Sequence, residues 1–146
     1  MKSSLIYVKD VMTRKVKTIP VTATIREAAK VMAKWKIGSL VVSDGKKPVG
    51  IVTEGDVSRA VARGLDPAEA TVSIARKRLV TVSPNERIEV AAKMMAAGRV
   101  KKLPVMEGEE LVGMLTQTDI VNSSFTLVTS LKEMVQARYR PPDFEV

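Results

Sequence analysis

The feature that most constrains this chain is an internal repeat. Sliding the 146-residue sequence by 63 positions aligns residues 11–57 with residues 74–120 without a gap, and 14 of the 47 aligned positions are identical. Ordinary composition would give roughly three such identities by chance. A repeat at a fixed offset indicates duplicated supersecondary units that bury a shared core. We therefore expect two similar halves related by a pseudo-twofold axis, with a cleft between them.

Each half carries the same series of local patterns. A short extended piece, residues 16–19 or 79–82, precedes a helix whose apolar residues recur at i, i+3, i+4, i+7 and i+8 from Ile25 or Ile88. Short runs of Val, Ile and Leu around a glycine turn then predict a hairpin, and a second helix follows it. The expected fold class is α+β, with two β-α-β-β-α repeats.

The starts of the two long helices carry recognisable signals. Thr24 and Glu27 fit a capping box, in which the threonine and the glutamate each satisfy a backbone N–H group. Ser83, Pro84 and Glu86 predict a similar start for the second long helix, because proline is favoured at the first helical position. The methionines and Trp35 are expected to pack in the core or at an interface.

Composition narrows the functions available. The sequence holds no Cys and no His, which excludes thiolate zinc sites, Cys nucleophiles and His-based triads. We therefore expect neither a metal site nor catalysis. The sequence has no apolar run long enough to span a bilayer and no extended apolar segment at the N-terminus, so we expect a cytoplasmic protein without a membrane partner. Scarce Asn and Gln lean towards a thermophile.

Two short motifs stand at the same place in the two halves. Residues 50–56 read G-I-V-T-E-G-D and residues 113–119 read G-M-L-T-Q-T-D. An apolar strand precedes each motif, at residues 38–42 (G-S-L-V-V) and 101–105 (K-K-L-P-V). On these motifs the chain resembles the CBS-domain family (cystathionine-β-synthase-type repeats). The resemblance implies a stand-alone tandem CBS-domain pair of archaeal or thermophile type.

The resemblance also sets expected boundaries. The first CBS repeat is placed at residues 8–64 and the second at residues 71–125. Residues 126–146 form a C-terminal extension, in which Leu127, Leu131, Met134 and Val135 recur at helical spacing.

The Thr-x-x-Asp parts of the motifs are the candidates for chemistry. Thr53 and Thr116 lie where a strand is expected to end and a helix to begin, and helix N-termini attract anions. Asp56 and Asp119, three residues on, could each accept hydrogen bonds from a ribose diol. The same spacing is also a capping box that needs no ligand, so the residues alone leave both interpretations open. The CBS resemblance implies ribose binding by both aspartates.

The resemblance implies further contacts around an adenine slot and a phosphate site. Arg59 and the residues just before the L-P-V strand would reach phosphates, although a solvated surface, or for Arg59 an i,i+3 pair with Asp56, is the alternative. The expected nucleotide-binding residues are Thr18, Ile19, Pro20, Gly38, Ser39, Thr53, Asp56, Arg59, Thr81, Val82, Ser83, Lys101, Lys102, Leu103, Pro104, Thr116 and Asp119.

The leading hypothesis is a regulatory module that binds AMP, ADP or ATP and signals to an unidentified protein partner as an energy or ligand sensor. It would need no cofactor and would form a homodimer through helix faces rich in Ala and Met.

The net charge of +8 also allows a nucleic-acid binder, with basic clusters at residues 14–17 and 76–78. The small number of aromatic residues and the lack of a helix-turn-helix signal weaken that alternative. S-adenosylmethionine or a dinucleotide would share the ribose and adenine contacts.

Overall fold

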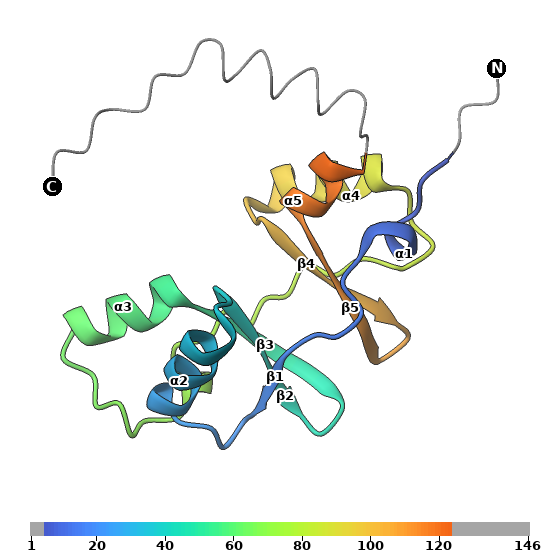
Figure 1. Cartoon of the computed structure of the whole chain (residues 1–146). Coiled ribbons are helices and arrows are strands. Elements are labelled where there is room, and N and C mark those ends of the chain that lie inside the picture. Colours follow the sequence, from blue (N-terminus) through green and yellow to red (C-terminus); the bar gives the residue numbers. More distant parts are fainter. Residues whose placement is uncertain (1–4, 124–146) are drawn as a thin grey trace, which may run out of the picture.

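The computed structural model describes residues 5–123, which fold as two similar α+β halves (Figure 1). The first half contains β1 (Thr18–Pro20), α2 (Ile25–Trp35), β2 (Ser39–Asp44), β3 (Lys47–Thr53) and α3 (Glu54–Ala62). The second half contains α4 (Ile88–Gly98), β4 (Lys102–Glu107), β5 (Glu110–Thr116) and α5 (Gln117–Asn122). A short α1 (Val8–Val11) precedes the first half, and the 3₁₀ turn η1 (Thr71–Ser73) precedes the second. The C-terminal extension expected at residues 126–146 lies outside the described residues.

The hairpins of the two halves reproduce the 63-residue offset in their register. β2 pairs antiparallel with β3 from Ser39 opposite Thr53, and β4 pairs with β5 from Lys102 opposite Thr116. A register shift follows the fourth residue of β2 and of β4, and a glycine with positive φ forms each turn. The duplicated α+β fold predicted from the sequence is confirmed.

The strand that completes each sheet is better developed in the first half. β1 runs parallel to β2, with Ile19 opposite Val42. In the second half a single parallel bridge joins Val82 to Val105, which are the residues 63 positions further on. The extended piece predicted at residues 79–82 therefore makes one bridge, where the first half forms a strand.

Each half has its own apolar core between the sheet and the helices. The two cores use equivalent residues, for example Met32, Leu40 and Val52 in the first and Met95, Leu103 and Leu115 in the second. Trp35 does not pack in either core, because 51% of it is exposed and the Nζ atom of Lys17 lies 3.8 Å from its ring centre.

The segments that open the two repeats each pair with the hairpin of the other half, so they are exchanged between the halves; we call residues 7–13 and 70–76 the lead-in segments. The backbones of Thr13 and Met114 form two hydrogen bonds of 2.9 Å, and those of Ile51 and Arg76 form two of 3.0 and 2.8 Å. The first lead-in segment thus pairs side by side with β5, and the second pairs side by side with β3. Val8 accordingly packs in the core of the second half, beside which α1 lies in Figure 1.

The predicted helix starts have different outcomes. Thr24 caps α2, because its hydroxyl accepts a 3.1 Å hydrogen bond from the backbone N–H of Glu27. The start predicted at Ser83 and Pro84 is wrong, because α4 begins at Ile88 without a side-chain cap. Ser83 instead closes a turn, accepting from the N–H of Glu86 at its carbonyl (3.1 Å) and from the N–H of Asn85 at its hydroxyl (3.2 Å). This local hydrogen bonding competes with helix formation.

Candidate functional site

Both Thr-x-x-Asp motifs form capping boxes at strand-to-helix junctions. At the start of α3, Thr53 Oγ1 accepts from the N–H of Asp56 at 3.2 Å, and Asp56 Oδ2 accepts from the N–H of Thr53 at 2.9 Å. At the start of α5, the corresponding bonds of Thr116 and Asp119 are 3.1 and 2.9 Å long. One carboxylate oxygen of each aspartate, Oδ2, therefore serves the fold, and Oδ1 is left outside the capping box.

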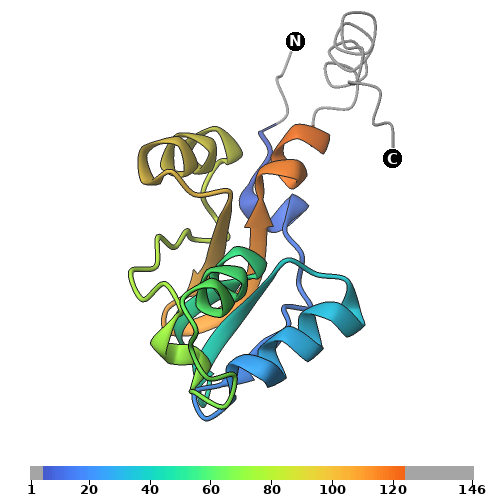
Figure 2. The same cartoon turned by 90° about the vertical axis from the view of Figure 1, so that its left-hand side faces the viewer.

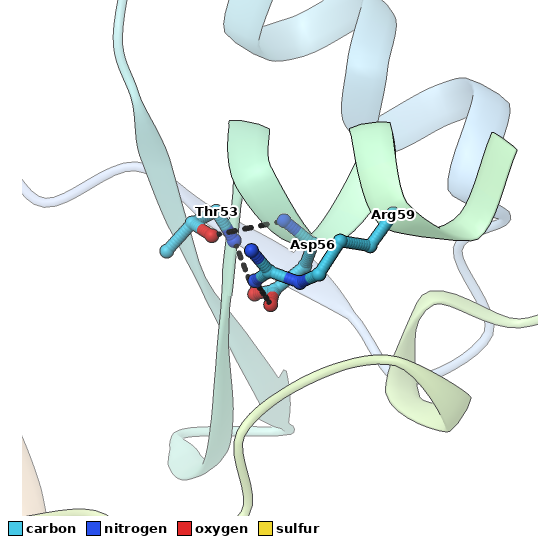
Figure 3. Close-up of polar contacts among 3 residues, drawn as sticks. All are labelled: Thr53, Asp56 and Arg59. Carbon is cyan, nitrogen blue, oxygen red and sulfur yellow. Dashed lines mark hydrogen bonds and ion pairs between the residues drawn. The ribbon is translucent and has the colours of Figure 1, made fainter. Parts of the chain in front are cut away.

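The Oδ1 atoms have different neighbours. Asp56 Oδ1 accepts a 2.7 Å charge-assisted hydrogen bond from Arg59 Nη2, drawn in Figure 3. The Arg59 side chain is 68% exposed, and an exposed ion pair of this kind contributes about 0–1 kcal/mol. A ligand hydroxyl can therefore replace Arg59 at small cost. The residue equivalent to Arg59 is Asn122, and within residues 5–123 no hydrogen bond to Asp119 Oδ1 is found.

Gly55 gives Arg59 room to fold back over the N-terminus of α3. A Cβ atom added to Gly55 would lie 3.2 Å from Arg59 Nη1 and 3.6 Å from Thr53 Oγ1. The equivalent residue at the start of α5 is Thr118. The first junction thus holds a guanidinium group beside its carboxylate, as seen in Figure 3, whereas the second has Thr118 and Asn122 at the equivalent positions.

A cleft of about 620 Å³ opens beside Asp56 and has walls from both halves. Its volume falls within the range of roughly 300–1,000 Å³ that is usual for small-molecule sites. The first half contributes the β3–α3 junction, and the second contributes the connection between α4 and β4. The lining residues are Gly38, Ile51, Thr53, Asp56, Arg59, Arg76, Arg99, Val100, Lys101 and Lys102.

The backbone at the end of α4 directs a basic segment into this cleft. Arg99, the C-cap of α4, has a left-handed conformation with φ of 52°, which turns the chain from the helix into β4. Non-glycine residues seldom adopt this conformation. Lys36 has the same conformation at the end of α2, with φ of 53°, so the turn belongs to the repeat.

The charge of the cleft is strongly positive. Its lining includes five Arg or Lys residues and a single carboxylate, that of Asp56. Lys102 also crosses to the first half, where its Nζ atom donates a 2.8 Å hydrogen bond to Ser39 Oγ. The side chains therefore present hydrogen-bond donors from both repeats to an anionic ligand.

The structure brings together part of the expected set. The expected residues that line the cleft are Gly38, Thr53, Asp56, Arg59, Lys101 and Lys102. The expected residues with buried side chains, which leave only their backbone for a ligand, are Ile19, Val82, Leu103 and Pro104. The exposed ones outside the cleft lining are Thr18, Pro20, Thr81 and Ser83, and Thr81 borders a separate hollow that is lined by residues of both hairpins.

Three residues of the cleft were not expected: Ile51, Arg76 and Val100. Arg99, which also lines it, belongs to the basic residues before β4 that were expected to reach phosphates. Arg76 enters through the exchange of lead-in segments, which pairs its backbone with Ile51. The sequence does contain a signal for Arg76, since it belongs to a basic run, residues 76–78, that suggested an anionic partner. The cleft to which it contributes follows only from the pairing.

Within residues 5–123, no three His, Cys, Asp or Glu side chains are arranged to hold a metal ion. No helix in the described part of the chain combines the length and apolar character that a bilayer crossing requires.

The chain matches the model of the CBS domain family twice, at residues 8–63 and 71–126. These matches cover most of the sequence, so the chain belongs to the CBS domain family and carries the domain as a tandem pair. The family resemblance drawn from the two Thr-x-x-Asp motifs is confirmed.

Solved structures of CBS proteins superpose closely on this chain. A CBS domain protein from Pyrobaculum aerophilum, complexed with AMP, gives a TM-score of 0.76 at 32% sequence identity, covering 88% of this chain and 99% of that one. The CBS domain pair of protein MJ0100, in complex with 5′-methylthioadenosine and S-adenosyl-L-methionine, gives 0.75 at 27% identity, covering 82% and 96%.

Some relatives are much longer proteins. Homoserine O-acetyltransferase from Methanohalobium evestigatum is 39% identical over 116 residues, which are 78% of this chain and 23% of the relative. This chain thus spans about a quarter of that relative's length.

Proposed function

We propose that this CBS pair is a regulatory module that binds an adenine nucleotide in the cleft beside Asp56. The observation that carries the proposal is the cleft itself, which combines a suitable volume, a carboxylate with one oxygen held only by an exposed arginine, and five basic side chains. The AMP complex of the Pyrobaculum aerophilum protein, which has the same fold, supports the choice of ligand class.

In the proposed complex the ribose diol binds Asp56 Oδ1. Arg59 leaves this atom and becomes free to contact phosphate, since its side chain is already 68% exposed. Asp56 Oδ2 stays bound to the backbone N–H of Thr53, so the cap of α3 survives ligand binding. Lys101 and Lys102 approach the phosphates from the second half.

The charge of the cleft favours a nucleotide over S-adenosylmethionine. The sulfonium group of that ligand is cationic, and like charges brought together in a partly enclosed site repel each other. Phosphate groups instead form charge-assisted hydrogen bonds with lysine and arginine. The complex of the MJ0100 pair makes S-adenosylmethionine the appropriate competing ligand in any test.

The regulatory part of the proposal follows from the shared walls of the cleft. A ligand held by residues of both halves favours the relative placement of the halves that makes these contacts. It can signal only if its affinity differs between two placements. We propose that a homodimer in the cytoplasm transmits this change to a partner protein and that the chain itself is not catalytic.

A thermal-unfolding and calorimetry panel of AMP, ADP, ATP, S-adenosylmethionine and 5′-methylthioadenosine tests the proposal. A nucleotide at ~100 times its dissociation constant should stabilise the fold by about 2.7 kcal/mol. Asp56→Ala should weaken nucleotide binding at least about tenfold, since it removes a charged hydrogen-bond partner.

The matched control is Asp119→Ala, which removes the same capping bond from α5. Its nucleotide affinity should stay closer to that of the wild type. Absence of any nucleotide effect on the wild type, or equal affinities of all three proteins, would contradict the proposal. Binding that needs nucleic acid and falls steeply with salt would favour the nucleic-acid alternative.

A further inference from the structure

Four of the five basic residues that line the cleft have no basic equivalent in the other repeat. The 63-residue offset assigns each lining residue an equivalent around Asp119. Only one of the five basic residues has a basic equivalent. The pairs are Arg59 with Asn122, Arg76 with Thr13, Arg99 with Lys36, Lys101 with Gly38, and Lys102 with Ser39.

The two sets therefore differ in formal charge. Five basic residues and Asp56 give the cleft lining a net charge of +4. In the equivalent set, Lys36, Asp119 and Lys101, which is the equivalent of Gly38, give a net charge of +1. Glu54 is a further carboxylate beside the cleft, since a Cβ atom on Gly38 would lie 3.9 Å from its Oε2 atom, and including it still leaves +3.

A single phosphate group has too few acceptor oxygens and too little charge to pair with all five basic side chains. A terminal phosphate offers three strong acceptor oxygens and a charge of about −2. The basic side chains come from three separate segments of the chain: α3, the second lead-in segment, and the connection from α4 to β4. A chain of phosphates brings more charge and more oxygens, and it can extend from one wall towards another.

We infer that the cleft beside Asp56 selects nucleoside polyphosphates over monophosphates, and that the equivalent position beside Asp119 lacks this selectivity. The inference rests on the proposed nucleotide binding and adds the class of nucleotide. The fold of the repeat does not require basic residues at positions 101 and 102, because the equivalent residues of the first half are Gly38 and Ser39.

Calorimetric titration with adenosine, AMP, ADP and ATP at one fixed salt concentration tests the inference. Affinity should rise about tenfold or more from AMP to ADP and again to ATP, because each step adds charge-assisted hydrogen bonds. Inorganic tripolyphosphate, titrated alone, should bind more weakly than ATP, since it lacks the ribose for Asp56.

The double variant Lys101→Gly, Lys102→Ser installs the residues found at the equivalent positions of the first half. Its ratio of ATP affinity to AMP affinity should fall at least about tenfold, while its AMP affinity changes much less. The matched control is Lys46→Gly, Lys47→Ser, which removes two lysines from the exposed tip of the first hairpin, outside the cleft. The control should keep the wild-type ratio.

The outcomes separate the inference from the proposed function. Equal affinities for AMP and ATP in the wild type would overturn the inference and leave nucleotide binding intact. Equal loss of the ratio in the two double variants would also overturn it, because bulk charge alone would then explain the preference. Tripolyphosphate binding as tightly as ATP would exclude nucleoside recognition. Failure of every adenine compound to bind would remove the proposed function as well.

Discussion

The two helix N-termini at Thr53 and Thr116 have almost the same backbone and very different surroundings. Their φ and ψ values are −117° and 164° in one case and −110° and 160° in the other, and both form a complete capping box. One is followed by Gly55 and Arg59, and the other by Thr118 and Asn122. The two repeats thus share the local geometry that starts a helix, while the residues around it that line the cleft beside Asp56 differ.

The largest expected effect concerns the glycines that face the exchanged segments. A Cβ atom on Gly113 would lie 2.6 Å from Met12 Sδ and 2.9 Å from the carbonyl oxygen of Thr13, whereas one on Gly50 would lie 3.1 Å from its nearest neighbours, Ala75 and Arg76. Gly113→Ala should therefore destabilise the fold by about 2–3 kcal/mol and Gly50→Ala by about 1 kcal/mol. Urea unfolding measures both, and equal costs would show that the two exchanged contacts are equally tight.

Replacing Val8 by threonine, or Thr71 by valine, should have the next largest effect on stability. These residues occupy equivalent positions in the lead-in segments and are both fully buried, and Thr71 Oγ1 has no hydrogen-bond partner within the described residues. Thr71→Val should stabilise the fold by about 1 kcal/mol, and Val8→Thr should destabilise it by about 1–2 kcal/mol. Denaturant midpoints would measure the effects, and a destabilised Thr71→Val variant would reveal a partner for the hydroxyl.

Removing either threonine cap should cost about 1 kcal/mol. Thr53→Ala and Thr116→Ala each delete a hydroxyl that accepts a backbone N–H bond, of 3.2 and 3.1 Å. Similar costs in urea unfolding would confirm that the junctions are equivalent for stability. A cost at only one of them would show that the equivalence is limited to geometry.

The smallest expected effect comes from the ion pair that distinguishes the two junctions. Arg59→Ala should change stability by less than about 1 kcal/mol, because the arginine side chain is 68% exposed. Thermal unfolding at low and high salt would measure it. A loss well above this value would mean that Arg59 holds α3 in place, and the easy displacement proposed for ligand binding would be wrong.

The repeat explains why much of the fold could be predicted from the sequence. The offset of 63 residues placed both hairpins, both capping boxes and the equivalent cores, because these features depend on local patterns that occur twice. The exchange of lead-in segments was not predicted, since backbone pairing between Thr13 and Met114 leaves no periodic trace. Arg76 was missed as a cleft residue for the same reason.

The exchange of lead-in segments has a consequence for any shortened form of the chain. A single repeat would expose the edge of its hairpin, and its core would lack the residues supplied by the other half, such as Val8. An exposed edge of this kind pairs readily with another chain. Two separated halves would have to meet by diffusion, whereas the covalent link supplies each lead-in segment at a high effective concentration. Tandem duplication thus turns what would be an association between molecules into a folding step within one.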